Sequence, residues 1–134
     1  MIYLDTSVAL AHLLAEDRTP PEALWTGTLV SSRLLEYELF VRLNALGLLN
    51  THGEIARALI DRVSLVELSP LVLGRVLAPF PRPVRTVDAF HLASIEFLRG
   101  RGRPITLASY DGRLTGAATR LGIPLFDLGQ PGSG

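Results

Sequence analysis

Short apolar runs alternate with longer stretches of helical periodicity along this chain, and this alternation limits its fold more than any other feature. The runs that read as strands lie at residues 2–5, 28–30, 64–68, 104–108 and 124–126. Between them, apolar residues recur at the three- and four-residue spacing of an amphipathic helix. Strands separated by helices pair in parallel, and a parallel sheet needs helices on both faces. The sequence therefore predicts an α/β fold with a central parallel sheet of about four to five short strands.

Several of the expected helices begin at residues that favour a helix N-terminus. Their predicted ranges are 7–16, 22–25, 32–47, 51–62, 87–98 and 112–121, with a further short helix from Pro70. Ser69 is expected to cap the helix at Pro70, and Thr86 the helix that begins at Val87. The length of 134 residues suits one compact domain. We expect that domain to span residues 1–128, followed by a flexible tail at 129–134.

Composition excludes several function classes. The chain has no cysteine, which rules out disulfides, zinc–thiolate sites and thiol nucleophiles. All 13 of its Lys and Arg residues are arginine, so a P-loop lysine and Schiff-base chemistry are excluded as well. No apolar stretch approaches the roughly 18 residues of a membrane span, and the N-terminus has no basic leader. A cytoplasmic protein without a membrane partner is expected.

The formal net charge is zero but unevenly distributed. Residues 1–74 carry five Arg and nine acidic residues, a net charge of −4. Residues 75–120 carry eight Arg and three acidic residues, a net charge of +5, and residues 121–134 add only Asp127, a charge of −1. An ordinary solvated surface would explain this asymmetry, and a basic surface for an anionic polymer such as RNA would explain it too.

Four carboxylates stand where the predicted fold directs them to one place. Asp5 and Asp111 follow predicted strands, Asp88 opens a predicted helix, and Glu38 lies within another. Parallel sheets place their chemistry at the carboxyl ends of the strands. Each pair of carboxylates about 5 Å apart costs roughly 3 kcal/mol at an effective dielectric near 20, so a gathered set calls for cations. Oxygen ligands without His or Cys favour Mg²⁺ or Mn²⁺.

Each acid also has a structural interpretation. Asp88 would be stabilised by the helix dipole in a first helical turn, and Asp111 could cap the helix that follows it. An acid that ends an apolar strand, as Asp5 does, is seldom only a cap. Glu38 could be a solvated residue beside the core, and His91, one turn after Asp88, reads as a core histidine with an internal hydrogen bond.

Four segments in order resemble the PIN-domain ribonucleases, in particular the VapC-type toxins of bacterial toxin–antitoxin pairs. They are IYLDTS at 2–7, SSRLLEYEL at 31–39, DAFHLAS at 88–94 and TLASYDGRL at 106–114. The resemblance covers nearly the whole chain and implies a PIN-like fold. It also implies a Mg²⁺-dependent endoribonuclease toxin that hydrolyses RNA phosphodiesters with metal-activated water, forms a homodimer and is neutralised by a cognate antitoxin.

The resemblance assigns Asp5, Glu38, Asp88 and Asp111 as the catalytic, metal-binding acids. Glu36 competes with Glu38 for the second motif, but helical spacing turns the two about 200° apart, so only one can face the site. Thr6, Ser7 and Ser109 are expected to orient carboxylates or water around the metal. Weaker candidates for RNA contact are all arginines: Arg82, Arg85, Arg99, Arg101 and Arg103.

Two alternatives share the same fold. One is a PIN-domain nuclease that processes RNA without an antitoxin. The other is a catalytically inactive PIN-like module that only binds, which the presence of all four acids argues against. A haloacid-dehalogenase-type phosphohydrolase is rejected, because Ser7 stands where that family has its second aspartate and the chain has no lysine.

Overall fold

The computed structural model describes residues 1–129, so the predicted tail lies outside the described residues apart from Gly129. The strands are β1 (Ile2–Leu4), β2 (Leu29–Ser32), β3 (Ser64–Val66) and β4 (Thr106–Ala108). The helices are α1 (Thr6–Leu13), α2 (Glu22–Thr26), α3 (Leu34–Ala45), α4 (Leu49–Asp61), α5 (Pro70–Val76), α6 (Thr86–Gly100) and α7 (Gly112–Arg120). Among the described residues, no helix is both long and apolar enough to cross a membrane.

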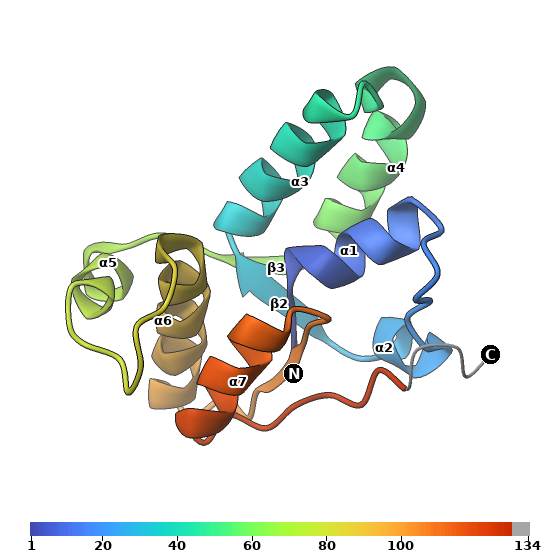
Figure 1. Ribbon diagram of the computed structural model, residues 1–134. Helices are drawn as coiled ribbons and strands as arrows, with labels where there is room; N and C mark the ends of the chain where they lie inside the picture. The colour runs from blue at the N-terminus through green and yellow to red at the C-terminus, as the bar shows by residue number, and fades with distance from the viewer. Residues whose placement is uncertain (130–134) are drawn as a thin grey trace.

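The four strands form one parallel sheet in the order β3-β2-β1-β4 (Figure 1). Tyr3 of β1 lies opposite Val30 of β2 and Leu107 of β4. The predicted strand at 124–126 is reduced to a single bridge, between Leu107 and Leu125. This parallel arrangement confirms the predicted fold class, and it brings the carboxyl ends of β1 and β4 to the same edge of the sheet.

Alternating side chains of the strands divide the core between the two faces of the sheet. Ile2 and Leu4 of β1 pack in a cluster with apolar residues of α1, α2, α3 and α4. Tyr3, between them in sequence, points the other way into a cluster with residues of α6 and α7. Helix α5 packs on α6 at the outside (Figure 1). Helices therefore cover both faces, as predicted for a buried parallel sheet.

The predicted helix starts agree with the structure at one helix and differ at another. The Ser69 hydroxyl caps α5 by accepting a hydrogen bond from the amide of Val72. Thr86, expected to cap α6, is instead the first residue of that helix, and the capping position falls on Arg85 without a side-chain capping bond. The extended backbone of Arg85 leaves its side chain free to reach back to Asp88 in the first turn of α6.

Candidate functional site

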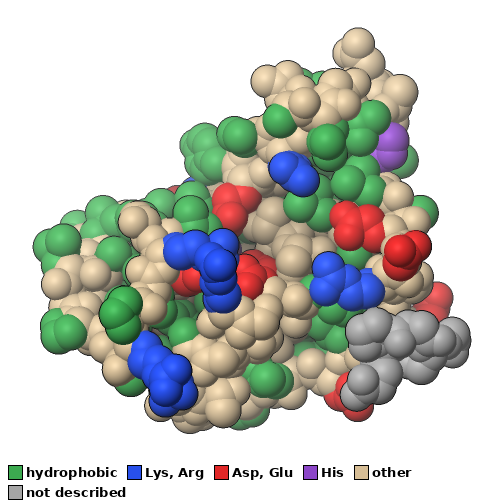
Figure 2. Space-filling model, viewed as in Figure 1, with side chains coloured by type: hydrophobic (Ala, Val, Ile, Leu, Met, Phe, Trp, Pro, Cys, Tyr) green, Lys and Arg blue, Asp and Glu red, His purple; other side chains and the backbone are tan. Residues whose placement is uncertain are grey.

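The four acids of the candidate site lie where helices meet the carboxyl edge of the sheet. Asp5 joins β1 to α1, and Asp111 joins the end of β4 to α7. Asp88 lies in the first turn of α6, and Glu38 lies in the second turn of α3. Two strand ends thus supply one acid each, and so do two helices, one on each face of the sheet. Figure 2 shows acidic side chains gathered here in the middle of the molecule, with arginine side chains beside them.

Asp5 is buried, with 6% of its surface exposed, and two serines fix its carboxylate. The hydroxyls of Ser7 and Ser109 donate to Asp5 Oδ2 over 2.6 and 2.7 Å. The Ser7 and Ser109 oxygens in turn accept from the amides of Tyr110 and Asp111. Asp5 also caps α1, since its carboxylate accepts from the Ser7 amide. The predicted neighbours Ser7 and Ser109 do meet Asp5, which combines the role of a cap with that of a buried acid.

Glu38 is held from two sides, and Glu36 is turned away. Glu38 Oε1 accepts from the Thr6 hydroxyl at 3.0 Å and lies 2.6 Å from His91 Nε2. The other ring nitrogen of His91, Nδ1, lies 2.8 Å from the hydroxyl of Tyr3. Glu36 instead pairs with Arg33 and Arg57 on the other side of α3. Of the two glutamates in the motif, Glu38 is the one directed toward the other acids.

A single arginine joins the remaining two acids. Arg85 binds Asp88 through two hydrogen bonds, from Nε to Oδ2 at 2.9 Å and from Nη2 to Oδ1 at 3.1 Å. The same Nη2 donates to Asp111 Oδ2 at 2.6 Å. Asp88 is only 4% exposed, so the guanidinium balances a buried negative charge. Asp111 Oδ1 caps α7 by accepting from the amides of Arg113 and Leu114, which confirms the capping interpretation of Asp111.

These contacts shift the pKa values of Asp111, Arg85 and His91. Burial raises the pKa of the Asp111 carboxyl, but hydrogen bonds from the Arg113 amide and the Arg85 guanidinium outweigh it, and the net shift is downward. The hydrogen bonds to Asp88 and Asp111 raise the pKa of Arg85. Burial lowers the pKa of His91, yet the bond to Glu38 and the nearby acids leave it raised overall. The nearby acids thus stabilise the charged forms of Arg85 and His91.

The donor set fits a hard divalent cation. Within residues 1–129, no three His, Asp or Glu side chains are placed as a finished metal-binding cluster. However, Ser109 links two of the acidic residues, because its hydroxyl donates to Asp5 Oδ2 and accepts from the backbone amide of Asp111. Thr6, the neighbour of Asp5 in the chain, donates to Glu38. Asp88 and Asp111 already converge on one positive charge, the guanidinium of Arg85. Carboxylate oxygens of this kind are the ligands that Mg²⁺ and Mn²⁺ prefer.

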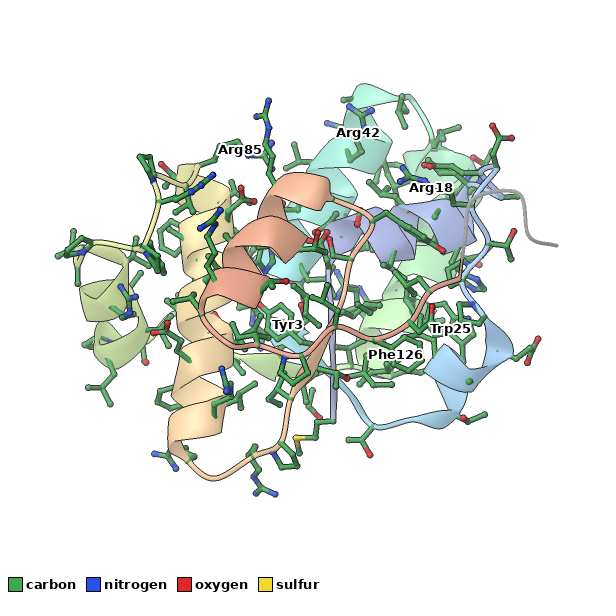
Figure 3. The ribbon with its side chains drawn as sticks, turned by 60° about the horizontal axis from the view of Figure 1, so that its bottom comes forward. Tyr3, Arg18, Trp25, Arg42, Arg85 and Phe126 are labelled. Carbon is green, nitrogen blue, oxygen red and sulfur yellow. The ribbon has the colours of Figure 1, made fainter. Side chains whose placement is uncertain are left out.

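The arginines proposed for RNA contact fall into two places. Arg82 and Arg85 lie in the loop before α6, and Figure 3 shows Arg85 beside α6 and α7. The other three candidates lie just before β4. Arg99 is in the last turn of α6, and Arg101 and Arg103 lie between α6 and β4. Because Asp111 follows the end of β4 and these residues precede its start, the structure puts them at the opposite edge of the sheet. The contact between the N-terminal amine and the Pro104 carbonyl, at 3.1 Å, belongs to that edge.

Two features of the site are absent from the sequence-based prediction. Arg85 was predicted only as an RNA contact, and its i,i+3 spacing to Asp88 was the available signal for an ion pair. His91 does have the predicted internal hydrogen bond, but one of its two partners is the candidate acid Glu38. Nothing in the sequence indicates the bond from His91 to Tyr3, because those residues are 88 positions apart.

No protein-family model matches the chain. Curated proteins do match it. Ribonuclease VapC35 of Mycobacterium tuberculosis, found in two strains, is 31% identical over 140 residues. The alignment covers 97% of this chain and 98% of that relative. The likeness therefore extends over nearly the whole chain rather than one motif.

Proposed function

This chain belongs to the VapC-type PIN-domain ribonucleases, and we propose that it is an Mg²⁺- or Mn²⁺-dependent endoribonuclease. Its proposed site comprises Asp5, Glu38, Asp88 and Asp111. The observation that supports the proposal is the place of these acids on strands and helices that meet at one edge of the sheet. There a buried acid is fixed by two serines, and two others share one positive charge.

A divalent cation in such a site supplies Lewis-acid chemistry, polarising a phosphodiester and activating water for attack on phosphorus. The chain's own part is to hold its acids in fixed orientations. Ser7 and Ser109 fix one oxygen of Asp5, and Thr6 and His91 fix one oxygen of Glu38. Contacts of this kind to metal-binding acids contribute about 10–100-fold in affinity or activity. Arg85, whose side chain is 52% exposed, can turn from Asp88 to a substrate phosphate.

The proposal includes partners. We expect a homodimer, and an antitoxin that neutralises the nuclease in the cytoplasm. Large apolar side chains exposed on two helices support protein contacts. Leu71 on α5 and Leu77 at its C-cap are 73% and 90% exposed, and on α3, Tyr37 and Val41 are 60% and 68% exposed. The absence of cysteine is compatible with a reducing compartment.

The test is cleavage of a structured RNA pool by the purified protein in Mg²⁺, in Mn²⁺ and in EDTA. Cleavage is expected with either metal and not in EDTA. Asp5→Asn and Asp88→Asn are each expected to lower the rate by more than about 100-fold, because each removes a carboxylate ligand. Far-UV circular dichroism is expected to show an intact fold.

Asp61→Asn is the matched control, since Asp61 is an exposed acid at the end of α4 and its variant should cut like the wild type. Full activity of the Asp5 or Asp88 variant would overturn the assignment of the site. No cleavage with any metal, by a folded protein that still binds RNA, would favour the inactive binding module.

A further inference from the structure

A cavity of about 570 Å³ has Asp88, one of the four acids, in its wall. Its walls are the loop at residues 82–85, Asp88 at the start of α6, and one face of α7 from Gly112 to Arg120. We call it the α6–α7 groove. Arg85 and Asp88 belong both to this groove and to the candidate site. A strand whose phosphodiester lay at the acids could therefore continue into the groove without leaving the surface.

The groove is strongly positive. Four arginines and one aspartate line it, a net formal charge of +3. Arg85 is neutralised by Asp88 and Asp111. Arg82, Arg113 and Arg120 have no ion pair within residues 1–129. Three cations from two separate segments around one cavity, without an internal counter-charge, attract an anionic ligand.

Two glycines open the groove on the side of α7. Gly112 and Gly116 are four residues apart and both line the cavity. A Cβ atom built at either position meets no other atom within 4 Å, so the packing of this chain does not require glycine there. Glycine inside a helix costs roughly 0.5–1 kcal/mol relative to alanine. No packing contact within the folded chain offsets this cost at Gly116. The missing side chain leaves a bare helix surface that a flat ligand can approach.

The size of the groove limits the ligand. Its volume lies within the range of roughly 300–1,000 Å³ found for small-molecule sites, which suits one nucleotide with its base turned out of a stack. An RNA duplex presents a broad, shallow minor groove and a phosphate backbone rather than a free base. The groove is therefore suited to an unpaired nucleotide.

We propose that the α6–α7 groove binds one unpaired nucleotide of the RNA strand, next to the phosphodiester that is cut. Arg82, Arg113 and Arg120 contact its phosphates, and the bare surface at Gly112 and Gly116 receives its base or sugar. This inference rests on the proposed ribonuclease function and adds the place on this chain that holds the nucleotide beside the cut phosphodiester.

The experiment measures binding in the Asp5→Asn background, where cleavage is removed. A labelled single-stranded oligoribonucleotide is titrated by fluorescence anisotropy at several salt concentrations, with the same sequence closed into a hairpin stem for comparison. Arg113→Gln and Arg120→Gln are each expected to weaken binding about 5–10-fold and to reduce the salt slope by about one ion. Gly116→Leu is expected to weaken binding about 10-fold without changing the salt slope, because it fills the groove without removing charge. The hairpin stem is expected to bind the Asp5→Asn parent as weakly as the single strand binds the Gly116→Leu variant.

Two control variants match these changes. Arg103 is itself a candidate RNA contact, so the charge control is Arg62→Gln instead, at the C-cap of α4 just before β3. Gly53→Leu adds the same side chain on α4, where a Cβ atom also meets nothing within 4 Å. Arg62→Gln and Gly53→Leu are expected to bind within 2-fold of the parent, roughly the scale of a remote charge change. Groove variants that bind RNA as tightly as these controls would overturn the inference. If the same chain with Asp5 restored still cleaves RNA, the proposed ribonuclease function is retained. If that chain neither binds nor cuts RNA, both proposals fail.

Discussion

Arg85 is the residue on which the charge balance of the site depends. It is the ion-pair partner of the buried Asp88 and also of Asp111. Without it, two neighbouring carboxylates would face each other uncompensated unless a cation took its place. The guanidinium therefore occupies, in electrostatic terms, the position that a divalent ion would fill.

Arg85→Gln is expected to lower the free energy of unfolding in EDTA by about 1–2 kcal/mol, since charged hydrogen bonds to a buried acid are lost but the arginine is half exposed. Millimolar Mg²⁺ should then raise the melting temperature of the variant more than that of the wild type, because binding to the folded state alone stabilises it. Differential scanning fluorimetry with and without Mg²⁺ measures both effects. Arg82→Gln, in the same loop and without an ion pair within residues 1–129, should not change the Mg²⁺ response. Equal shifts in all three proteins would contradict the compensating role of Arg85.

Asp111 links protonation to stability. Its pKa in the folded protein lies below the ordinary value, so the folded state favours the charged form. The stabilisation is complete above the pKa of the unfolded chain and is lost as the pH falls through the folded pKa. Asp111→Asn keeps a capping oxygen and removes the charge. Urea unfolding from about pH 7 to 3 should show the wild type more stable at neutral pH, by up to about 1 kcal/mol for this partly exposed pair, and the difference should shrink as the pH falls below the ordinary carboxyl pKa. A constant difference would point to the cap instead.

At the scale of the element, two glycines at helix α7 differ in whether the backbone needs glycine. One lies within the helix and the other just after its C-cap. Gly116 lies inside the helix in open space. Gly122 follows the C-cap with a φ of 72°, and its amide and that of Ile123 bond to the carbonyls of Thr119 and Ala118, which is a Schellman ending. Gly116→Ala should raise the free energy of unfolding by about 0.5–1 kcal/mol. Gly122→Ala should lower it by about 1 kcal/mol, because alanine is strained at positive φ. Urea denaturation of the pair measures both, and a loss of stability in Gly116→Ala would show an unrecognised packing role.

The elements themselves were largely predictable, because periodicity and caps are local. Ser69 before Pro70 determined the start of α5, and Asp111 that of α7. Thr86 was misplaced by one residue, since Arg85 is drawn toward two acids, one of them 26 positions away. The strand at 124–126 was predicted from an apolar run, but it meets the sheet only at Leu125. Asp5, Asp88 and Asp111 were proposed from their places at strand and helix ends and Glu38 from its motif, and their role in a metal site remains a prediction. The serine, histidine and arginine contacts that orient them depend on three-dimensional placement.

At the scale of the whole molecule, one sheet joins two apolar clusters. Leu107 of β4 is fully buried in the cluster beneath α6 and α7. Trp25, the single tryptophan, packs against the other cluster, and Figure 3 shows it near Phe126 beside α2. Because β1 contributes to both clusters, the two are expected to unfold together. That residues 1–128 form one domain remains a prediction.

Leu107→Ala should cost about 2–5 kcal/mol through lost burial and a cavity. Tryptophan fluorescence and far-UV circular dichroism should report the same shifted urea midpoint, although Leu107 and Trp25 lie on opposite faces of the sheet. If the fluorescence midpoint remained at the wild-type value, the two faces would be separate folding units.

Asp5 and Asp111 each cap a helix while belonging to the proposed site, and this double use has a consequence for a mutant library sorted by loss of activity. Asparagine at either position should be recovered as an abundant, inactive protein, because it still accepts the capping hydrogen bond. Alanine or leucine should be recovered at reduced cellular abundance, since the cap is lost as well. Glu38 caps no helix, so the cellular abundance of its inactive variants should depend on the size of the new side chain rather than on its ability to cap a helix. Sequencing such a library against protein level would thus separate helix-starting acids from the rest without a structure.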